Sequence, residues 1–154
     1  MNVSLIITTY NRPDALFLVL KSIELQSMLP DEIIIADDGS GDLTKKCIVN
    51  FQKNSTIKLI HSWQNDKGFR VAESRNKAIA SSSYEYIILV DGDMILHHKY
   101  IEDHINNAEL GFFVQGSRVL LTEDETNKIL DSKKIIFSFF STGLKNRKNA
   151  IRSN

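Results

Sequence analysis

The chain has 154 residues, 42% hydrophobic and 25% charged, which suits one globular domain with a buried core. Its 19 basic and 19 acidic residues cancel, and without a supporting motif we expect no nucleic-acid partner. No stretch approaches the roughly 18 apolar residues of a membrane-spanning helix, and the N-terminal residues do not resemble a signal peptide. Cys47 is the only cysteine, which excludes an intramolecular disulfide and favours a reducing, cytoplasmic location.

Predicted strands and helices alternate along most of the chain. A β-rich run at residues 3–9 precedes a helix that Pro13 opens and that carries an apolar stripe at helical spacing. Further strands are predicted at residues 32–37, 57–61, 84–90 and 112–114, and further helices at residues 44–51, 70–80 and 100–109. Helical segments between strands favour parallel pairing with right-handed crossovers. We therefore predict an α/β fold, a three-layer Rossmann-like sheet that is mostly parallel.

The end of the chain differs in charge from the rest. We expect an α/β domain at residues 1–132 and a basic, partly apolar tail at residues 133–154. The tail has no acidic residue, which leaves 13 basic and 19 acidic residues in the first 132. Its basic residues are Lys133, Lys134, Lys145, Arg147, Lys148 and Arg152. A solvated terminus is one interpretation; the apolar run at residues 135–140 beside these cations alternatively suits peripheral binding to an anionic lipid surface.

The motif Asp91-Gly92-Asp93 follows the apolar run at residues 86–90, which we expect at the centre of the sheet. Ligands of open parallel sheets bind beyond the carboxyl ends of the strands. Two neighbouring carboxylates repel each other and favour a cation between them, and Mg²⁺ or Mn²⁺ prefers oxygen ligands. Gly92 allows the bend that turns both side chains toward one ligand. The alternative is a simple acidic turn.

Two more strand ends offer groups for a nucleotide base. After the second strand, a carboxylate of Asp37 or Asp38 can accept a hydrogen bond from a base or a ribose hydroxyl, or merely cap the next helix. After the first strand, Thr8 and Tyr10 provide a hydroxyl and an aromatic ring that suit the same base. The two loops together favour base binding.

Arg70 and Arg75 lie where a loop leads into the third predicted helix. A guanidinium there can neutralise a diphosphate or hold Asp91, and the alternative is a surface arginine that pairs with Glu73. Among the histidines, we expect His61 and His104 in packing roles. His97 and His98, just past the acidic motif, are further candidates for a metal role.

With these residues, the chain resembles glycosyltransferase family 2, which has the A-type glycosyltransferase fold. Four segments carry the resemblance, in the family's order and spacing over roughly residues 1–116. They are TTYNRP at residues 8–13, DDGS at 37–40, GFRVAESRN at 68–76 and DGD at 91–93. The third segment is most similar to bacterial enzymes that add galactose, N-acetylgalactosamine or similar sugars to surface polysaccharides.

The resemblance implies a UDP-sugar donor, a glycan or lipid-linked acceptor, and inverting transfer with Mn²⁺ or Mg²⁺ as cofactor. Thr8, Tyr10 and Asp38 would hold the uracil. Asp91 would contact ribose or the metal, and Asp93 would ligate the metal. The expected donor-binding residues are Thr8, Tyr10, Asn11, Asp38, Arg70, Arg75, Asp91 and Gly92, and the expected metal ligands are Asp93 and Asp91.

Relatives in this family continue past the metal motif with acceptor-binding loops and a later carboxylate that acts as base. No segment here matches that region, so we expect only the donor-binding part and assign no catalytic base. A non-catalytic nucleotide-sugar-binding module is therefore an alternative. A nucleotidyltransferase is another, although the residues after the first strand lack the glycine-rich phosphate loop typical of that class.

Overall fold

The computed structural model describes residues 1–135, 137 and 140–150. It divides the chain into two compact units, residues 1–106 and residues 107–154, so the compact unit with the strand-end motifs stops before the predicted boundary at residue 132. The prediction that the donor-binding domain spans residues 1–132 is not tested by this division. Most of the apolar run at residues 135–140, and Arg152 of the basic tail, lie outside the described residues.

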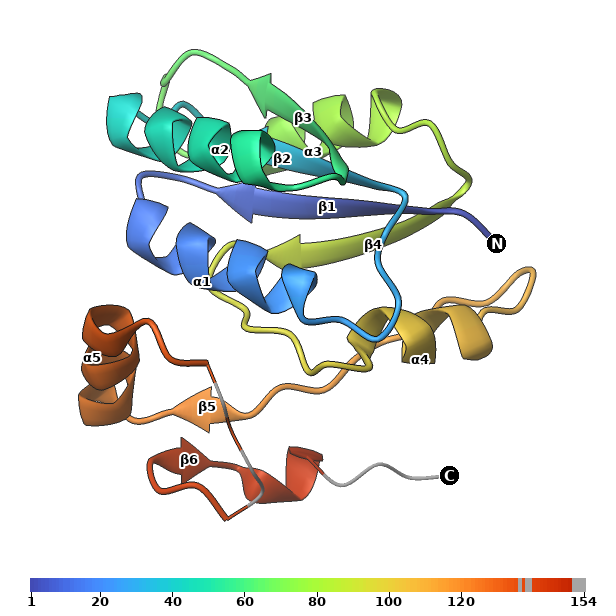
Figure 1. The fold of residues 1–154 in the computed structure, drawn as a ribbon. Helices are drawn as coiled ribbons and strands as arrows, with labels where there is room; N and C mark the ends of the chain where they lie inside the picture. The colour runs from blue at the N-terminus through green and yellow to red at the C-terminus, as the bar shows by residue number, and fades with distance from the viewer. Residues whose placement is uncertain (136, 138–139, 151–154) are drawn as a thin grey trace. The chain divides into compact units, whose positions relative to one another are not determined.

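The first unit contains a parallel sheet with the strand order β3-β2-β1-β4 (Figure 1). The strands are β1 (Val3–Thr9), β2 (Glu32–Asp37), β3 (Lys58–Trp63) and β4 (Tyr86–Asp91). The helices are α1 (Pro13–Glu24), α2 (Asp42–Asn54), α3 (Val71–Ala80) and α4 (Tyr100–Asn106). Because all four strands run the same way, the loops that follow them meet at one edge of the sheet. The predicted α/β class is confirmed.

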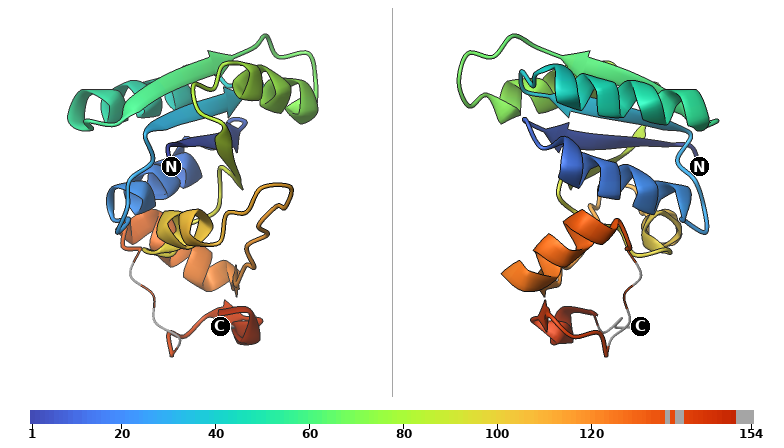
Figure 2. Two further views of the ribbon diagram at one scale, coloured as in Figure 1. Left: turned by 90° about the vertical axis from the view of Figure 1, so that its right-hand side faces the viewer. Right: turned by 60° about the vertical axis from the view of Figure 1, so that its left-hand side comes forward.

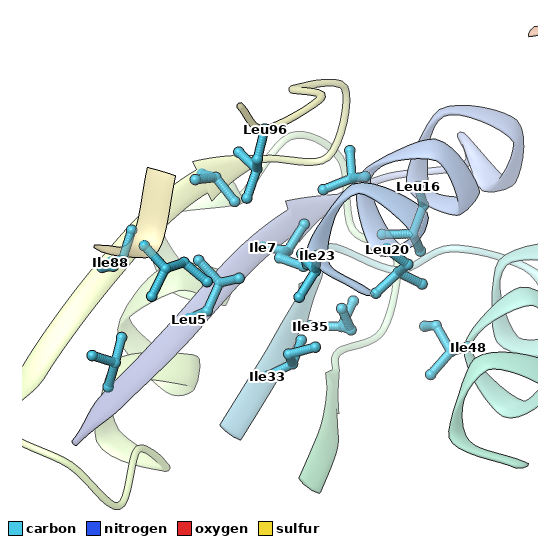
Figure 3. Packing of buried hydrophobic residues seen from close by; sticks show 14 residues of the cluster. Leu5, Ile7, Leu16, Leu20, Ile23, Ile33, Ile35, Ile48, Ile88 and Leu96 are labelled. Carbon is cyan, nitrogen blue, oxygen red and sulfur yellow. The ribbon is translucent and has the colours of Figure 1, made fainter. Parts of the chain in front are cut away.

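Helices cover both faces of this sheet. Leu5 and Ile7 of β1 point to the face that packs against α1 and α2, whereas Ile6 points to the face covered by Ala78 of α3. Figure 2 shows α2 and α3 on opposite sides of the strands. Figure 3 shows the larger core, in which aliphatic side chains of β1, β2 and β4 interdigitate with those of α1 and α2. The predicted three-layer architecture is confirmed.

Strand β4 does not lie at the sheet centre, where the apolar run at residues 86–90 predicted it. It pairs with β1 and forms an edge of the sheet within the described part of the chain. Leu89 is consequently 49% exposed, and the Asp91 side chain at the strand end is half exposed. An apolar run predicts a strand but does not reveal how many strands pair with it, because side chains report on the two faces of the sheet, whereas neighbouring strands pair through the backbone.

The predicted strand at residues 112–114 is also wrong. The chain is irregular from residue 112 to residue 119, and α4 ends at Asn106 instead of reaching Glu109. Phe112 and Phe113 are 73% and 87% exposed. A short aromatic run has β propensity, but propensity without a partner strand does not form a sheet.

The described residues of the second unit form a small two-stranded sheet, with a helix between its two strands in the sequence. Strands β5 (Leu120–Leu121) and β6 (Leu144–Lys145) pair antiparallel, and α5 spans Glu123–Ser132, followed by a 3₁₀ turn, η1, at Arg147–Ala150. Thr122 caps α5 by accepting a hydrogen bond from the backbone N–H of Glu125, and three acidic residues occupy the first turn, as the helix dipole favours. No helix among the described residues is both long and apolar enough to cross a membrane.

Candidate functional site

Asn11 joins the loops that follow β1 and β2. Its backbone N–H donates to Ser40 Oγ at 2.9 Å, and its side-chain Oδ1 accepts from Gly41 N at 2.9 Å. Asn11 has φ 49°, a left-handed conformation that asparagine tolerates better than most residues. Asn11 therefore holds together two loops at the edge of the sheet where the strands end, which we call the carboxyl edge. Its role in donor binding stays a prediction.

Asp38 ties the loop after β2 to the loop after β3 and to the start of α3. One oxygen accepts from Gln64 Nε2 at 2.6 Å, and the other accepts from the backbone N–H of Arg70 at 2.7 Å. Gln64 is oriented because its amide oxygen accepts from Lys77 Nζ at 2.9 Å. Asp38 is only 4% exposed, so its carboxylate mainly organises the edge of the sheet.

Its neighbour Asp37 stabilises the turn that follows β2. One oxygen accepts from the backbone N–H of Ser40 and the other lies 2.8 Å from His61 Nε2. Burial raises the pKa of Asp37, but the hydrogen bonds from His61 and Ser40 outweigh it, and the net pKa is lowered. His61, expected as a packing residue, therefore has a specific polar partner, which its sequence neighbours did not indicate.

Asp91 brings together three of the predicted donor-site residues. Its Oδ1 accepts from Arg75 Nη2 at 2.6 Å and from Thr8 Oγ1 at 3.0 Å. Gly92 lets the turn pass over the end of β1, since an added Cβ would lie 2.4 Å from the Thr8 carbonyl oxygen. The hypothesis that an arginine holds Asp91 is confirmed for Arg75.

Arg70 has other partners. Its Nη1 donates to Glu73 Oε2 at 2.7 Å, and its Nη2 donates to the carbonyl of Asn65 at 2.6 Å. The alternative of a pair with Glu73 is therefore the one observed. The guanidinium thus links the loop after β3 to the first turn of α3. The backbone N–H of the same residue donates to Asp38.

Asp93 is exposed just beyond the turn. No group of three histidine, cysteine or acidic side chains in the described parts of the chain is placed to hold a metal ion, so His97 and His98 gain no support as ligands. The carboxylates of Asp91 and Asp93 remain as the candidate metal ligands. Mg²⁺ and similar hard ions are usually held by one or two carboxylates together with substrate phosphates and water. The donor set thus fits an ion whose coordination a bound diphosphate would complete.

Asp66 is a residue of this edge that the motifs missed. The Tyr10 hydroxyl donates to its Oδ2 at 2.9 Å, and the backbone N–H of Gly68 donates to its Oδ1 at 3.1 Å. The hydrogen bond to Asp66 raises the pKa of Tyr10, whose ring is about half exposed. Asp66 lies between two family-like segments in the sequence, and its turn with Gly68 was the one signal that could have drawn attention to it.

Residues 4–153 match the model of glycosyl transferase family 2. The chain belongs to this family. Among its relatives, the hyaluronan synthase of Pasteurella multocida is 30% identical over 71% of this chain and 12% of its own length. The poly-β-1,6-N-acetyl-D-glucosamine synthase of Staphylococcus epidermidis is 31% identical over 76% of this chain and 29% of its own length. The family 2 chain therefore spans less than a third of these relatives.

Solved structures share the fold of the family 2 chain. S. aureus TarS, residues 1–349, superposes with a TM-score of 0.58 at 25% identity, covering 69% of this chain and 32% of that one. TarS has also been solved in complex with UDP and with UDP-GlcNAc. Glucosyl-3-phosphoglycerate synthase of Mycobacterium tuberculosis, in complex with Mn²⁺, UDP and glucosyl-3-phosphoglycerate, superposes with a TM-score of 0.54 at 20% identity, over 68% of this chain and 38% of that one. These superpositions agree with the predicted A-type glycosyltransferase fold.

Proposed function

We propose that this chain is the donor-binding part of an inverting glycosyltransferase that uses a UDP-sugar. The observation that carries the proposal is the cluster of Thr8, Arg75 and Asp91 at the carboxyl edge, with the exposed carboxylate of Asp93 two residues farther on. Ligands of parallel α/β sheets bind at this edge. The UDP complexes of TarS support the choice of nucleotide, and the two polysaccharide synthases support a glycan product.

In this proposal, the half-exposed ring of Tyr10 stacks on the uracil, and Thr8 with Asp91 faces the ribose. Asn11, Asp38 and the backbone of Arg70 hold the loops that form the base pocket. Gly92 keeps the turn close enough to β1 for Asp91 and Asp93 to face the same diphosphate. Arg75 balances the charge of Asp91 and stands beside the phosphates.

Asp93, together with Asp91, would hold Mn²⁺ or Mg²⁺. When bound, the ion offsets the negative charge of the diphosphate and of the UDP that departs. An acceptor hydroxyl, on a glycan or a lipid-linked glycan, attacks the anomeric carbon from the side opposite the departing UDP, which inverts that centre. The proton of the hydroxyl passes to a base that we do not assign among these residues.

We place the chain in the cytoplasm, where nucleotide sugars would reach it, and in peripheral contact with an anionic membrane through the basic tail. The support for this contact is the run of cations from Lys133 to Lys148 without an acidic residue. Binding to anionic vesicles that weakens with salt in a flotation assay is the expected result. Equal flotation with neutral and anionic vesicles would contradict it.

Calorimetric titration of UDP, GDP and CMP, with and without Mn²⁺, tests the donor site. We expect a preference for UDP, an increase in UDP affinity of about tenfold or more with Mn²⁺, and loss of that increase in Asp93→Ala, because carboxylates are strong ligands for hard cations. Asp131→Ala, an exposed residue of α5, is the matched control and should keep it. Equal binding of all nucleotides, or indifference to Mn²⁺, would contradict the proposal.

A product assay with UDP-galactose, UDP-N-acetylgalactosamine and UDP-GlcNAc then separates an enzyme from a binding module. Transfer to an oligosaccharide acceptor would show turnover by this chain. UDP binding without any transfer would support the non-catalytic alternative.

A further inference from the structure

Two buried polar side chains near the end of α1 contact the segment that follows the acidic motif. Ser22 is 2% exposed and Gln26 is 8% exposed, and both are close in sequence to Ile23 of the apolar core. A buried polar group costs stability unless it is hydrogen-bonded, so the partners of such side chains indicate what they do. Here the distant partners are 71 to 75 residues away in the sequence, between Leu96 and Ile101.

The contacts of these two side chains are with the main chain of that segment. The amide nitrogen of Gln26 donates to the carbonyl of His97 at 2.8 Å and to that of Ser22 at 3.1 Å, and the amide oxygen accepts from the backbone N–H of Ile101 at 3.2 Å. The hydroxyl of Ser22 donates to a carbonyl of α1 and accepts from the backbone N–H of Leu96 at 3.1 Å. Ser22 and Gln26 therefore hold the segment at three points.

The segment needs such contacts because it is irregular. Residues 94–97 belong to neither a helix nor a strand, so regular secondary structure does not pair their backbone groups. The side chain of Leu96 also packs in the larger core (Figure 3). Two residues separate Leu96 from Asp93, and a chain of three residues spans at most about 11 Å. The anchored Leu96 therefore limits where Asp93 can lie.

The two carboxylates of the acidic motif are held in different ways. Asp91 is oriented directly, because its side chain accepts hydrogen bonds from Thr8 and Arg75. Asp93 is exposed, so its place relative to Asp91 depends on the main chain that carries it. That main chain is fixed on one side by the turn at Gly92 and on the other by the anchored segment. A small hard ion tolerates little error in the positions of its oxygen ligands.

Building on the proposed donor function, we infer that Ser22 and Gln26 are positioning residues for the metal ion. They fix the main chain after Asp93, so that its carboxylate and that of Asp91 face one ion and the diphosphate. They act through the backbone and not as ligands, because they lie near the end of α1 that is remote from the carboxyl edge.

The test is calorimetric titration of UDP with and without Mn²⁺. Gln26→Met keeps a side chain of similar length but removes the partner of the His97 carbonyl and of the Ile101 N–H. The Mn²⁺-dependent increase in UDP affinity should fall at least about threefold, since groups that orient metal ligands typically contribute about 10- to 100-fold to metal affinity. UDP affinity without Mn²⁺ should change less than about twofold, as expected for distant sites. Ser22→Ala, a smaller change, should act in the same direction.

Two control variants separate positioning from a general loss of stability. Ser27→Ala removes a hydroxyl that donates to Glu102 Oε2 at 2.6 Å, but the backbone N–H of Ser27 still donates to the carbonyl of His98. Ile48→Val shortens a fully buried side chain of the same core on α2 and should lower the melting temperature. Both controls should keep the Mn²⁺-dependent increase.

The outcomes separate this inference from the proposed function. An unchanged Mn²⁺-dependent increase in Gln26→Met and Ser22→Ala would overturn the inference. An equal loss of UDP affinity with and without Mn²⁺ would also overturn it, as would the same effect in Ile48→Val. In each case the unaltered chain still binds UDP more tightly with Mn²⁺, so the proposed donor function survives. Absence of that increase in the unaltered chain would overturn both.

Discussion

Glu32→Gln is expected to lower the free energy of unfolding by up to about 3 kcal/mol at pH 7 and by little at pH 2. Glu32 lies at the amino end of β2 and is fully buried. Its Oε1 accepts from Ser4 Oγ at 2.7 Å and from Ser83 N at 2.6 Å, and its Oε2 accepts from Lys58 Nζ at 2.7 Å and Ser83 Oγ at 2.9 Å. One carboxylate therefore joins β1, β3 and the segment before β4.

The pH dependence follows from the pKa of Glu32. Burial alone raises this pKa, but the hydrogen bonds from Lys58, Ser83 and Ser4 outweigh burial and lower it from 4.5 to about 2. Because the folded-state pKa lies below the unfolded value, the contribution is fully present above pH 4.5 and is lost as the pH falls through about 2. The 3 kcal/mol is an upper bound, since Lys58 is half exposed and solvent screens its charge.

Urea unfolding followed by circular dichroism at pH 7, 5 and 3 measures this dependence. The difference in free energy between the unaltered chain and Glu32→Gln should shrink as the pH falls. Glu85→Gln, at an exposed position near the same end of the sheet, is the matched control and should cost less than about 0.5 kcal/mol. A difference that stays constant from pH 7 to pH 3 would show that packing of the side chain, rather than its charge, stabilises this edge.

Gly39→Ala is expected to destabilise the protein by about 3 kcal/mol, from two separate causes. Gly39 has φ 102°, a conformation that costs an alanine about 1–2 kcal/mol. In addition, the new Cβ would lie within 2.8 Å of three atoms of Asp66, two of them backbone, and overpacking of this kind costs about 1–3 kcal/mol. The loop that carries Asp66 must move to admit the methyl group.

Gly68→Ala provides the matched control within the same loop system. Gly68 has φ 83°, but an added Cβ would meet no atom within 4 Å. Its substitution should cost only the conformational term, about 1 kcal/mol. The difference between the two variants in the free energy of unfolding, from thermal or urea unfolding, measures the cost of the close approach of Gly39 to Asp66. Equal losses of stability in the two variants would contradict this contact. Gly39→Ala should also weaken UDP binding.

The elements and the layers of the first unit could be predicted from the sequence. Local patterns suffice for this: Leu16, Leu20 and Ile23 mark one face of α1, and Ile33–Ile35 is a run that only a strand covered on both faces buries. The sequence also predicted the edge of the sheet at which the motif residues lie, because the carboxyl ends of all strands in a parallel sheet lie at the same edge. Thr8, Arg75 and Asp91 met there as expected.

The sequence alone determined the fold class, the family, and the strand ends at which we propose the donor site. The tertiary structure decided the rest: that β4 is an edge strand in the described sheet, that Arg75 and not Arg70 holds Asp91, and that Asp66 faces Tyr10. These three depend on which segments become neighbours across 16 to 83 residues of sequence, and no local pattern of hydrophobicity or charge contains that information. Periodicity shows which face of an element is buried, but contacts between loops arise only once the sheet has brought the strand ends together.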